Sequence, residues 1–268
     1  MYFFSMGQMV RRPVAANYIS IGAYSTIHSD IFSFTANQAT LARFKNISAG
    51  VYGERRFMLN ELSLYKVVFA IPAKSGNFGL NTGYYGFAAY NETQAALAYA
   101  RSLGSKIDIG VQFSYNGIKA ARYGNAYAIS MEAGIIMHLT DKLNAGIHIN
   151  NPAGGKYNKG ENEKLPFVYT AGLGYDASET FFVSAEVQKE EDQPVNVNAG
   201  LQYKFLPRLL ARAGVATATS AAWFGIGIGI QSFRLDVTAG YHPQLGITPG
   251  LLLVFNFQAT AENEKKNQ

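Results

Sequence analysis

The sequence contains no cysteine, and its 268 residues include a single tryptophan and only 15% charged residues. Without cysteine there are no disulfide frameworks, thiolate metal sites or thiol nucleophiles. Long apolar runs are also missing, because the richest stretches, 65–73 and 250–257, are about half of the roughly 18 to 20 residues that a membrane-spanning helix needs. A helical membrane protein is therefore excluded.

Charge of one sign is not concentrated in any part of the chain. The formal net charge is +5, but the 23 Lys and Arg residues are spread along the sequence, so nucleic acid is not expected as a partner. A hydrophobic share of 48% is too high for a disordered chain. The mean hydropathy is nevertheless close to zero, at −0.02. This composition is typical of a sheet protein with one apolar face.

From about residue 46 onward, apolar residues recur at every second position, which is typical of half-buried strands. Val197 and Leu201, for example, fall on one face of their segment, and Asn198 and Gln202 fall on the other. Turn signals separate such runs, and their number predicts about fourteen strands of about ten residues. The predicted strands lie near 47–56, 62–73, 77–88, 91–103, 106–118, 125–140, 143–151, 165–176, 180–189, 194–205, 208–217, 221–231, 233–242 and 248–258.

Strands of this length fit an outer membrane, which about 9 to 11 tilted residues cross. A soluble β-sandwich or lipocalin-like barrel is the alternative, but sandwich strands are usually shorter, and so wide a soluble barrel would enclose a lumen that its apolar face could not fill. We therefore predict an all-β fold, a transmembrane antiparallel β-barrel of about 14 strands with its apolar face toward lipid and its polar face toward the lumen. The expected location is the outer membrane of a Gram-negative bacterium, with outer-membrane lipid as a partner.

The predicted inward face carries side chains of both charges. Mixed charges across a narrow lumen favour a paired network over a selectivity ring. Inward glycines, such as those of 225–229, leave space either for an internal plug and neighbouring side chains or for a ligand. The predicted lumen-facing polar network consists of Glu54, Arg56, Asp108, Glu132, His138, His148, Glu186, Lys204, Arg212, Arg234 and Asp236.

Catalytic and metal-binding motifs are scarce. The sequence contains no G-x-S-x-G, no H-E-x-x-H and no phosphate-binding loop. Ser130 and His138 lie on one predicted strand, roughly 25 Å or more apart, which is too far for a catalytic pair. His138 and His148 with Glu132 suggest a metal site, but a third ligand is not evident, and hydrogen-bonded structural histidines are the favoured interpretation. We expect no enzymatic activity, no cofactor and no metal.

The first half of the chain contains two motifs that resemble a known family. In the segment 29–42, Asp30 is followed by Asn37, Gln38, Ala39 and Leu41. This segment resembles the N-terminal signature of the FadL superfamily of outer-membrane barrels, an acidic residue followed by Asn-Pro-Ala-x-Leu, with Gln38 in the place of the proline. The stretches 53–62, 76–80 and 90–92 are similar to the PorV/PorQ-type branch of that superfamily in Bacteroidota.

The resemblance implies a barrel whose N-terminal segment enters the lumen as a small hatch. On this basis, residues 9–45 form the hatch, with Asp30, Asn37, Gln38 and Leu41 as its site residues, and residues 46–258 form the barrel. Residues 1–8 resemble the end of a secretory signal, and residues 259–268 form a polar tail. The longest polar insertion, 151–164, is the best candidate for an exposed contact loop.

Two functions follow from the resemblance. The leading expectation is a non-enzymatic accessory or scaffold in type IX secretion or envelope assembly, with a secretion translocon or other envelope proteins as partners. The alternative is a FadL-like passive transporter of a hydrophobic small molecule across the outer membrane.

Overall fold

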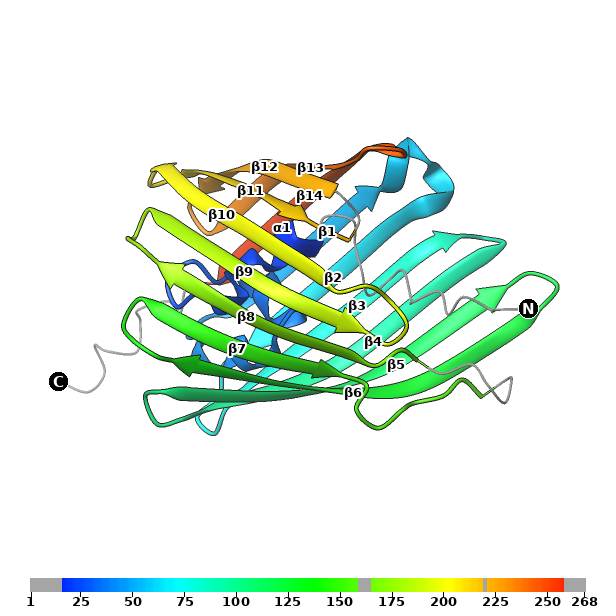
Figure 1. Ribbon diagram of the computed structural model, residues 1–268, viewed down its shortest axis with the longest axis horizontal. Coiled ribbons are helices and arrows are strands. Elements are labelled where there is room, and N and C mark those ends of the chain that lie inside the picture. Colours follow the sequence, from blue (N-terminus) through cyan, green and yellow to red (C-terminus); the bar gives the residue numbers. More distant parts are fainter. Residues whose placement is uncertain (1–15, 159–164, 219–220, 258–268) are drawn as a thin grey trace.

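Fourteen antiparallel strands close into one barrel in the computed structural model, which describes residues 16–158, 165–218 and 221–257 (Figure 1). Each strand pairs with its neighbours in sequence, and β1 closes the barrel against β14 through the pairs from Ile47↔Phe257 to Glu54↔Gly250. The strands are β1 (Ile47–Arg55), β2 (Ser63–Ile71), β3 (Asn77–Phe87), β4 (Tyr90–Leu103), β5 (Ile107–Ala120), β6 (Gly124–His138), β7 (Leu143–Asn150), β8 (Val168–Asp176), β9 (Phe181–Glu190), β10 (Asn196–Leu206), β11 (Leu209–Ala216), β12 (Ala221–Ile230), β13 (Phe233–His242) and β14 (Gly246–Phe257).

The predicted barrel is confirmed, and so is its strand number. The largest difference in position is at β8, which was expected from residue 165 and begins at Val168. Burial alternates strictly along the nine residues of β8, with Tyr169, Leu173 and Tyr175 on the exposed face. This two-residue period is the signal that the sequence carries, because successive side chains of a strand point to opposite faces of the barrel wall.

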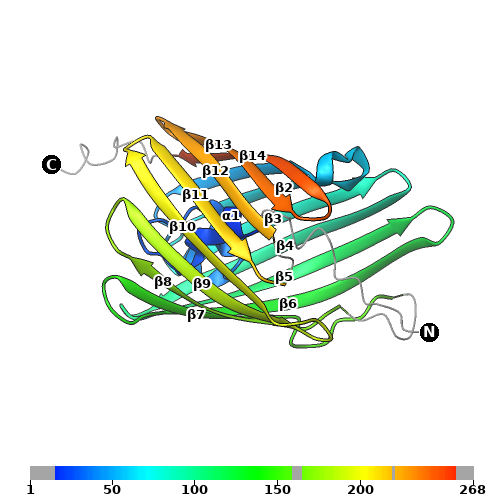
Figure 2. The same cartoon turned by 45° about the horizontal axis from the view of Figure 1, so that its top comes forward.

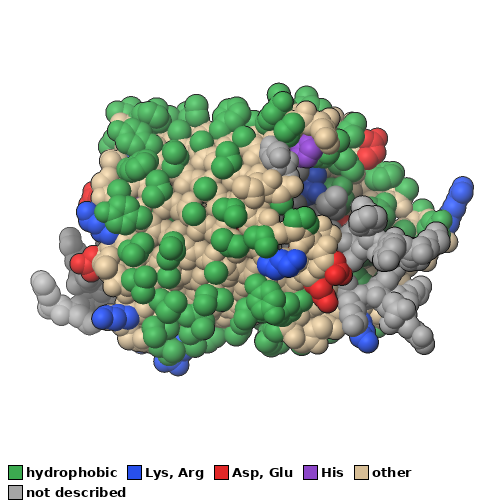
Figure 3. Space-filling model, in the orientation of Figure 1, with side chains coloured by type: hydrophobic (Ala, Val, Ile, Leu, Met, Phe, Trp, Pro, Cys, Tyr) green, Lys and Arg blue, Asp and Glu red, His purple; other side chains and the backbone are tan. Residues whose placement is uncertain are grey.

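Apolar side chains cover the outside of the barrel (Figure 3). Val51, Phe113, Ile226 and Leu251 are each exposed by half or more of their surface. In the view of Figure 3 apolar side chains far outnumber charged ones, most of which lie toward the left and right of the molecule. No helix in the described part of the chain is long and apolar enough to cross a membrane. An apolar band over a closed wall of strands is the surface that hydrocarbon requires.

The two ends of the barrel differ in their connections. At the end where β1 begins and β14 ends, the turns run from two residues, 207–208, to five residues, 72–76. We call this the short-turn end and the opposite one the long-loop end. The long-loop end carries the connection 151–167 and a second one over 56–62, which contains the 3-10 turns η5 (Arg56–Met58) and η6 (Asn60–Leu62).

The candidate contact loop lies partly against the barrel wall. The amide of Asn158 donates to the carbonyl of Tyr127 on β6 at 2.9 Å, and Tyr157 and Leu165 are buried against Ala128. Residues 159–164 of this loop lie outside the described residues, as do the expected signal remnant, 1–8, and the expected polar tail, 259–268.

Residues 16–46, ahead of β1, lie inside the barrel, where the strands enclose them in both ribbon views (Figure 2). We call residues 16–46 the luminal segment. It contains α1 (Ala16–Ser20), η2 (Ile21–Tyr24), η3 (Ile31–Thr35) and η4 (Gln38–Arg43). Helix α1 contacts β10 to β12, η2 contacts β7 to β9, η3 contacts β1 and β2, and η4 contacts β3 to β6. The segment therefore touches the wall on all sides.

Candidate functional site

Asp30 connects the luminal segment to the barrel wall. Locally it caps η3, since its Oδ1 accepts the amide of Phe32 at 3.0 Å and the Ser33 hydroxyl accepts the amide of Asp30 at 3.0 Å. Its other oxygen, Oδ2, accepts Nη2 of Arg212 at 2.9 Å and Nη2 of Arg234 at 2.6 Å. One carboxylate thus starts a helical turn and binds two strands, β11 and β13.

The two arginines continue into a closed circuit of polar contacts. Arg234 Nε donates to Oδ1 of Asp236 at 2.8 Å, the Tyr18 hydroxyl donates to Oδ2 of Asp236 at 3.0 Å, and Arg212 Nη1 donates to the Tyr18 carbonyl at 3.1 Å. Two carboxylates and two guanidinium groups balance each other in a buried site. Burial acts to raise the pKa of Asp30, but the Arg212 and Arg234 guanidiniums outweigh it and hold that pKa below its ordinary value.

His28 extends this network toward the short-turn end. Arg212 Nε donates to Oε1 of Gln202 at 2.7 Å, so the Gln202 amide nitrogen faces Nδ1 of His28, also at 2.7 Å. The Nε2 atom of His28 lies 3.1 Å from the carbonyl of Ser178. Nδ1 therefore accepts and Nε2 carries the proton, which describes a neutral imidazole. Burial lowers the pKa of His28, in agreement with that neutral state.

A second group of contacts holds the chain between η2 and η3. The Ser25 hydroxyl donates to Oδ1 of Asp176, and the amide and hydroxyl of Thr26 donate to Oδ2 at 3.1 and 3.2 Å. On the next strand, Glu186 accepts the Tyr24 hydroxyl at 2.9 Å. These contacts attach η2 and the residues after it to β8 and β9.

The third group involves the segment that resembles the family signature. Asn37 Nδ2 donates to the carbonyls of Ile135 and Ile147 at 3.3 and 3.2 Å, and Gln38 Nε2 donates to Oε2 of Glu132 at 3.0 Å. The same carboxylate oxygen lies 3.1 Å from Nε2 of His148. The Asn-Gln pair is thus bound to β6 and β7. A side chain at Gly110 on β5 would collide with the backbone of Gln38 and Ala39, so glycine is required there for this close approach.

His138 belongs to a separate site near the short-turn end. Asp108 Oδ2 accepts Nε of Arg43 at 2.6 Å and lies 2.7 Å from Nε2 of His138. The two histidines therefore face different carboxylates, Asp108 and Glu132. Among the described residues, no group of three His, Cys, Asp or Glu side chains could hold a metal ion.

Three of the predicted network residues lie apart from these contacts. Arg56 Nε donates to Oε1 of Glu54 at 2.9 Å, and this pair lies on the long-loop side of the lumen with the Tyr52 hydroxyl, 2.8 Å from Glu54 Oε2. The side chain of Lys204 is half-buried on β10 and donates to no described residue. Asp176 and Gln202 were not among the predicted site residues. Gln202 is on the predicted inward face of its strand, and Asp176 is the last residue of the predicted strand 165–176, next to the turn.

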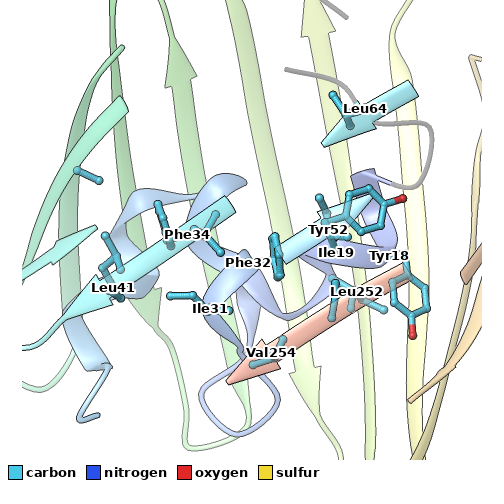
Figure 4. Packing of buried hydrophobic residues seen from close by; sticks show 14 of the residues in the cluster. Tyr18, Ile19, Ile31, Phe32, Phe34, Leu41, Tyr52, Leu64, Leu252 and Val254 are labelled. Carbon is cyan, nitrogen blue, oxygen red and sulfur yellow. The ribbon is translucent and has the colours of Figure 1, made fainter. Parts of the chain in front are cut away.

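The side of the luminal segment that faces β1, β2, β4 and β14 is apolar (Figure 4). Ile31, Phe32, Phe34 and Leu41 are buried in one cluster with residues of β1, β2, β4 and β14. The wall is built from small or apolar side chains here, namely Val68, Ala70, Ala98, Ala100, Leu252 and Val254. The expectation of a polar inward face is therefore wrong for this sector, because these residues pack against the luminal segment and not against water.

The luminal segment does not fill the lumen completely. A small hollow remains between this segment and strands β9, β10 and β12, lined by Ile21, Tyr24, Glu186 and Trp223 among others. Its lining combines aromatic rings with a carboxylate. At the level of η2 the luminal segment therefore occupies much of the lumen and leaves a small hollow beside β9, β10 and β12.

No protein-family model matches this chain, and no curated protein matches its sequence. Solved structures do share its fold. The toluene transporter TodX of Pseudomonas putida has a TM-score of 0.62 at 11% identity, over 87% of this chain and 95% of that chain. The toluene transporter TbuX of Ralstonia pickettii has a TM-score of 0.60 at 11% identity, over 85% and 94%. A Pseudomonas aeruginosa FadL homologue has a TM-score of 0.60 at 10% identity, over 90% and 96%. The fold of this chain is therefore that of the FadL-type outer-membrane barrels.

Proposed function

We propose that the protein is a passive outer-membrane channel for small hydrophobic molecules, in which the luminal segment acts as a hatch. The observation that supports this proposal is the unlike character of the segment's two sides. Hydrogen bonds and ion pairs attach one side to β5 to β13, whereas the other side meets β1 to β4 mainly through apolar side chains such as Ile31, Phe32 and Leu41. The polar contact on that side is made by Asn77 of β3, whose Nδ2 donates to the Leu41 and Phe44 carbonyls. An apolar molecule can replace apolar side chains at that contact without leaving a buried charge unpaired.

The direction of passage follows from the connections. Bacterial outer-membrane barrels have short periplasmic turns and longer extracellular loops, so the short-turn end faces the periplasm in this proposal. The hatch lies near that end, since Arg43 Nη2 donates to the carbonyl of Ser105 and His28 contacts that of Ser178, both in short turns. A molecule that enters from the long-loop end meets the hatch before it reaches the periplasm.

The similar structures support an apolar cargo in the same way. TodX and TbuX are described as toluene transporters, and toluene is apolar, as is most of the contact between the hatch and β1 to β4. We therefore take toluene as the first test molecule.

The absence of cysteine allows a reversible lock to test the proposal. A Cβ placed at Gly50 would overlap Ile31 Cγ2, at 2.9 Å, and Phe32 Cε2, at 2.6 Å. Ile31→Cys removes the first overlap and the Phe32 ring must shift to remove the second, so the double variant Ile31→Cys/Gly50→Cys brings the two sulfurs close enough to join the hatch to β1 when it is oxidised. Cells that display this variant should take up labelled toluene under reducing conditions and lose that uptake on oxidation. Each single-cysteine variant serves as the control and should transport under both conditions. Uptake that is the same in the oxidised and reduced double variant would overturn the proposed route.

A second candidate function is an accessory role of the PorV/PorQ type in type IX secretion or envelope assembly. The observation that favours it is the buried circuit of Asp30, Arg212, Arg234 and Asp236, which fixes the luminal segment to β11 and β13 through paired charges. Affinity purification from native membranes in mild detergent, followed by mass spectrometry, separates the two candidates. Stoichiometric recovery of translocon or assembly proteins would support the accessory role, and a barrel without such proteins would count against it.

A further inference from the structure

We infer that one sector of the short-turn end binds the phosphate headgroups of anionic membrane lipids. The sector comprises the short-turn ends of β1 to β5. Besides Arg43, which pairs with Asp108, it carries four exposed cations, Lys45, Lys74, Arg101 and Lys106. We call these four residues the basic rim. The inference rests on the proposed membrane location, but it does not depend on what passes through the lumen.

The fold brings the basic rim together from four separate stretches of chain. Lys45 precedes β1, and its neighbour Phe44 is held by Asn77 at the start of β3, whose Nδ2 donates to the Phe44 carbonyl at 2.8 Å. Lys74 lies in the turn between β2 and β3. The Tyr99 hydroxyl on β4 donates to the carbonyl of Ser75 in that turn at 2.7 Å, which places this turn beside the strand that carries Arg101.

Lys106 completes the rim in the turn between β4 and β5. Arg43 Nη2 donates to the carbonyl of Ser105 in this turn at 2.8 Å, so the end of η4 is attached to it. Arg101 lies on β4 opposite Ile109 of β5, on the outer face of the wall. All four cations therefore lie along one continuous arc of the barrel's edge.

No exposed carboxylate balances this arc. Asp108 is the single acidic residue in 41–50, 71–79 and 99–110, and it is buried between Arg43 and His138. None of the four rim cations donates a hydrogen bond to another described residue. The other half of the same end differs, because Asp141 and Glu179 are exposed there beside Lys142 and Arg208. Unbalanced positive charge therefore lies on one half of the short-turn end, at the basic rim.

The position of the basic rim next to the apolar band of the barrel favours a lipid headgroup as its ligand. Ile47, Ile71, Phe78, Leu103 and Ile107 are exposed at the same ends of these strands and each shows at least 40% of its surface. Cations directly above such an apolar band lie at the depth of lipid phosphates, where long side chains extend toward the interface. Attraction to an anionic leaflet is strongest at this depth and declines within a Debye length. The chemistry recognised is a lipid phosphate with net negative charge.

The test compares two sets of variants of the full chain. In the rim variant, Lys74→Gln, Arg101→Gln and Lys106→Gln are combined. The control, Lys142→Gln with Arg208→Gln, removes cations from the balanced half of the same end. Each purified protein is titrated in neutral detergent with phosphatidylglycerol or phosphatidylcholine, and native mass spectrometry counts the lipids that remain bound. Gel migration before and after heating confirms that each barrel is folded.

We expect the wild type to retain phosphatidylglycerol in preference to phosphatidylcholine, and the rim variant to lose that preference. The affinity for phosphatidylglycerol should fall by roughly fivefold for each cation removed, and the control should bind as the wild type does. Added salt should weaken retention by the wild type. Toluene uptake should be the same in all these proteins, so a failure of the transport proposal leaves the lipid result standing.

Three results would overturn the inference. One is equal retention of the two lipids by the wild type. Another is a loss in the control as large as that in the rim variant. The third is a rim variant that keeps its phosphatidylglycerol but no longer co-purifies with an envelope protein that the wild type retains, because the rim would then be a protein-binding surface.

Discussion

The wall of the lumen presents two unlike sectors to the luminal segment. Along β1, β2 and β4 the contact consists of residues such as Val68, Ala70 and Ala98, which meet the aromatic and aliphatic side chains of η3 and η4. Along β5 to β13 it consists mainly of carboxylates, arginines and amides in direct hydrogen bonds, among them Asp30 with Arg212 and Arg234, whose side chains are 6%, 1% and 18% exposed.

In the proposed channel, this difference separates two tasks of the luminal segment, to stay in place and to let an apolar molecule pass. Buried polar contacts are directional, and a partner that is removed leaves an uncompensated group, so they determine where the segment sits and penalise its displacement strongly. Apolar contacts scale with area and depend little on orientation. A segment held by both kinds can remain attached on one side while it yields to an apolar molecule on the other.

The largest expected effect is on the polar side, in the variant Asp30→Asn. This change leaves Arg212 and Arg234 buried without a carboxylate on the segment, and their side chains are only 1% and 18% exposed. We expect the free energy of opening of residues 16–46 to fall by about 3–5 kcal/mol. Amide hydrogen exchange of this segment measures that free energy.

The matched control is Asp141→Asn, in an exposed turn at the same end of the barrel. It should leave exchange of the luminal segment unchanged. If Asp30→Asn also left the exchange unchanged, the ion pairs would not hold the segment, and the distinction between the two sectors would fail.

On the apolar side, Val68→Ala tests whether packing closes the route. Val68 is 1% exposed in the cluster between the wall and the segment, and the loss of its two methyl groups should lower the free energy of opening by about 1–3 kcal/mol. Toluene uptake should rise, while ion conductance should stay low because the polar contacts remain. Its neighbour Val67 faces outward and is 47% exposed, so Val67→Ala should change neither quantity. Equal effects of the two variants would contradict the assigned facing.

Mild acid should weaken the polar side by a smaller amount. The pKa of His28 in the folded protein lies below its ordinary value of about 6.5, so the neutral imidazole is the form that the closed segment favours. Its contribution is therefore complete above about pH 6.5 and is lost as the pH falls toward the lowered pKa. Asp30, whose pKa is lowered from about 3.9, contributes above that pH and loses its contribution only at still lower pH.

Exchange of the segment at about pH 8 and about pH 5, corrected for the intrinsic pH dependence of exchange, measures this effect. The charged groups that act on His28 are Lys204, Arg212 and Asp176. The His28→Gln variant should lose most of the difference between the two pH values. A difference that persists in His28→Gln would assign the titration to another group.

The sequence was sufficient for the barrel, because lipid on one side requires an apolar residue at every second position of each strand. It was insufficient for the apolar sector of the lumen. Residues 251–254 read Leu-Leu-Leu-Val, so the period that would separate the lipid-facing from the lumen-facing residues is absent there. Their partner, the luminal segment, folds mostly into short 3-10 turns, which have no long repeat that a pattern could reveal.

For the polar network, the sequence predicts which side chains face the lumen but not which of them pair. The period of the strands places Arg212, Arg234 and Asp236 on the inward face, and the resemblance to the FadL signature singles out Asp30. Which carboxylate meets which arginine depends on contacts between residues 182 and 204 positions apart in the chain, and no local pattern contains that information. Asp176 was missed because an acidic residue at a strand end is also a common turn residue.

The smallest expected effect concerns Arg43 with Asp108, the ion pair of the described segment whose basic partner is the most exposed. Arg43 is 39% exposed, while Asp108 is 2% exposed and also faces His138, so Arg43→Gln removes a partner from a carboxylate that keeps another. We expect the opening free energy of η4 to fall by about 1 kcal/mol or less, and this difference should shrink in high salt, whereas the effect of Asp30→Asn should not. Hydrogen exchange of residues 38–43 at low and high salt measures both. If Arg43→Gln lowered the opening free energy as much as Asp30→Asn does, burial would not determine the strength of these ion pairs. Arg43 with Asp108 would then hold the segment as strongly as Asp30 with Arg212 and Arg234.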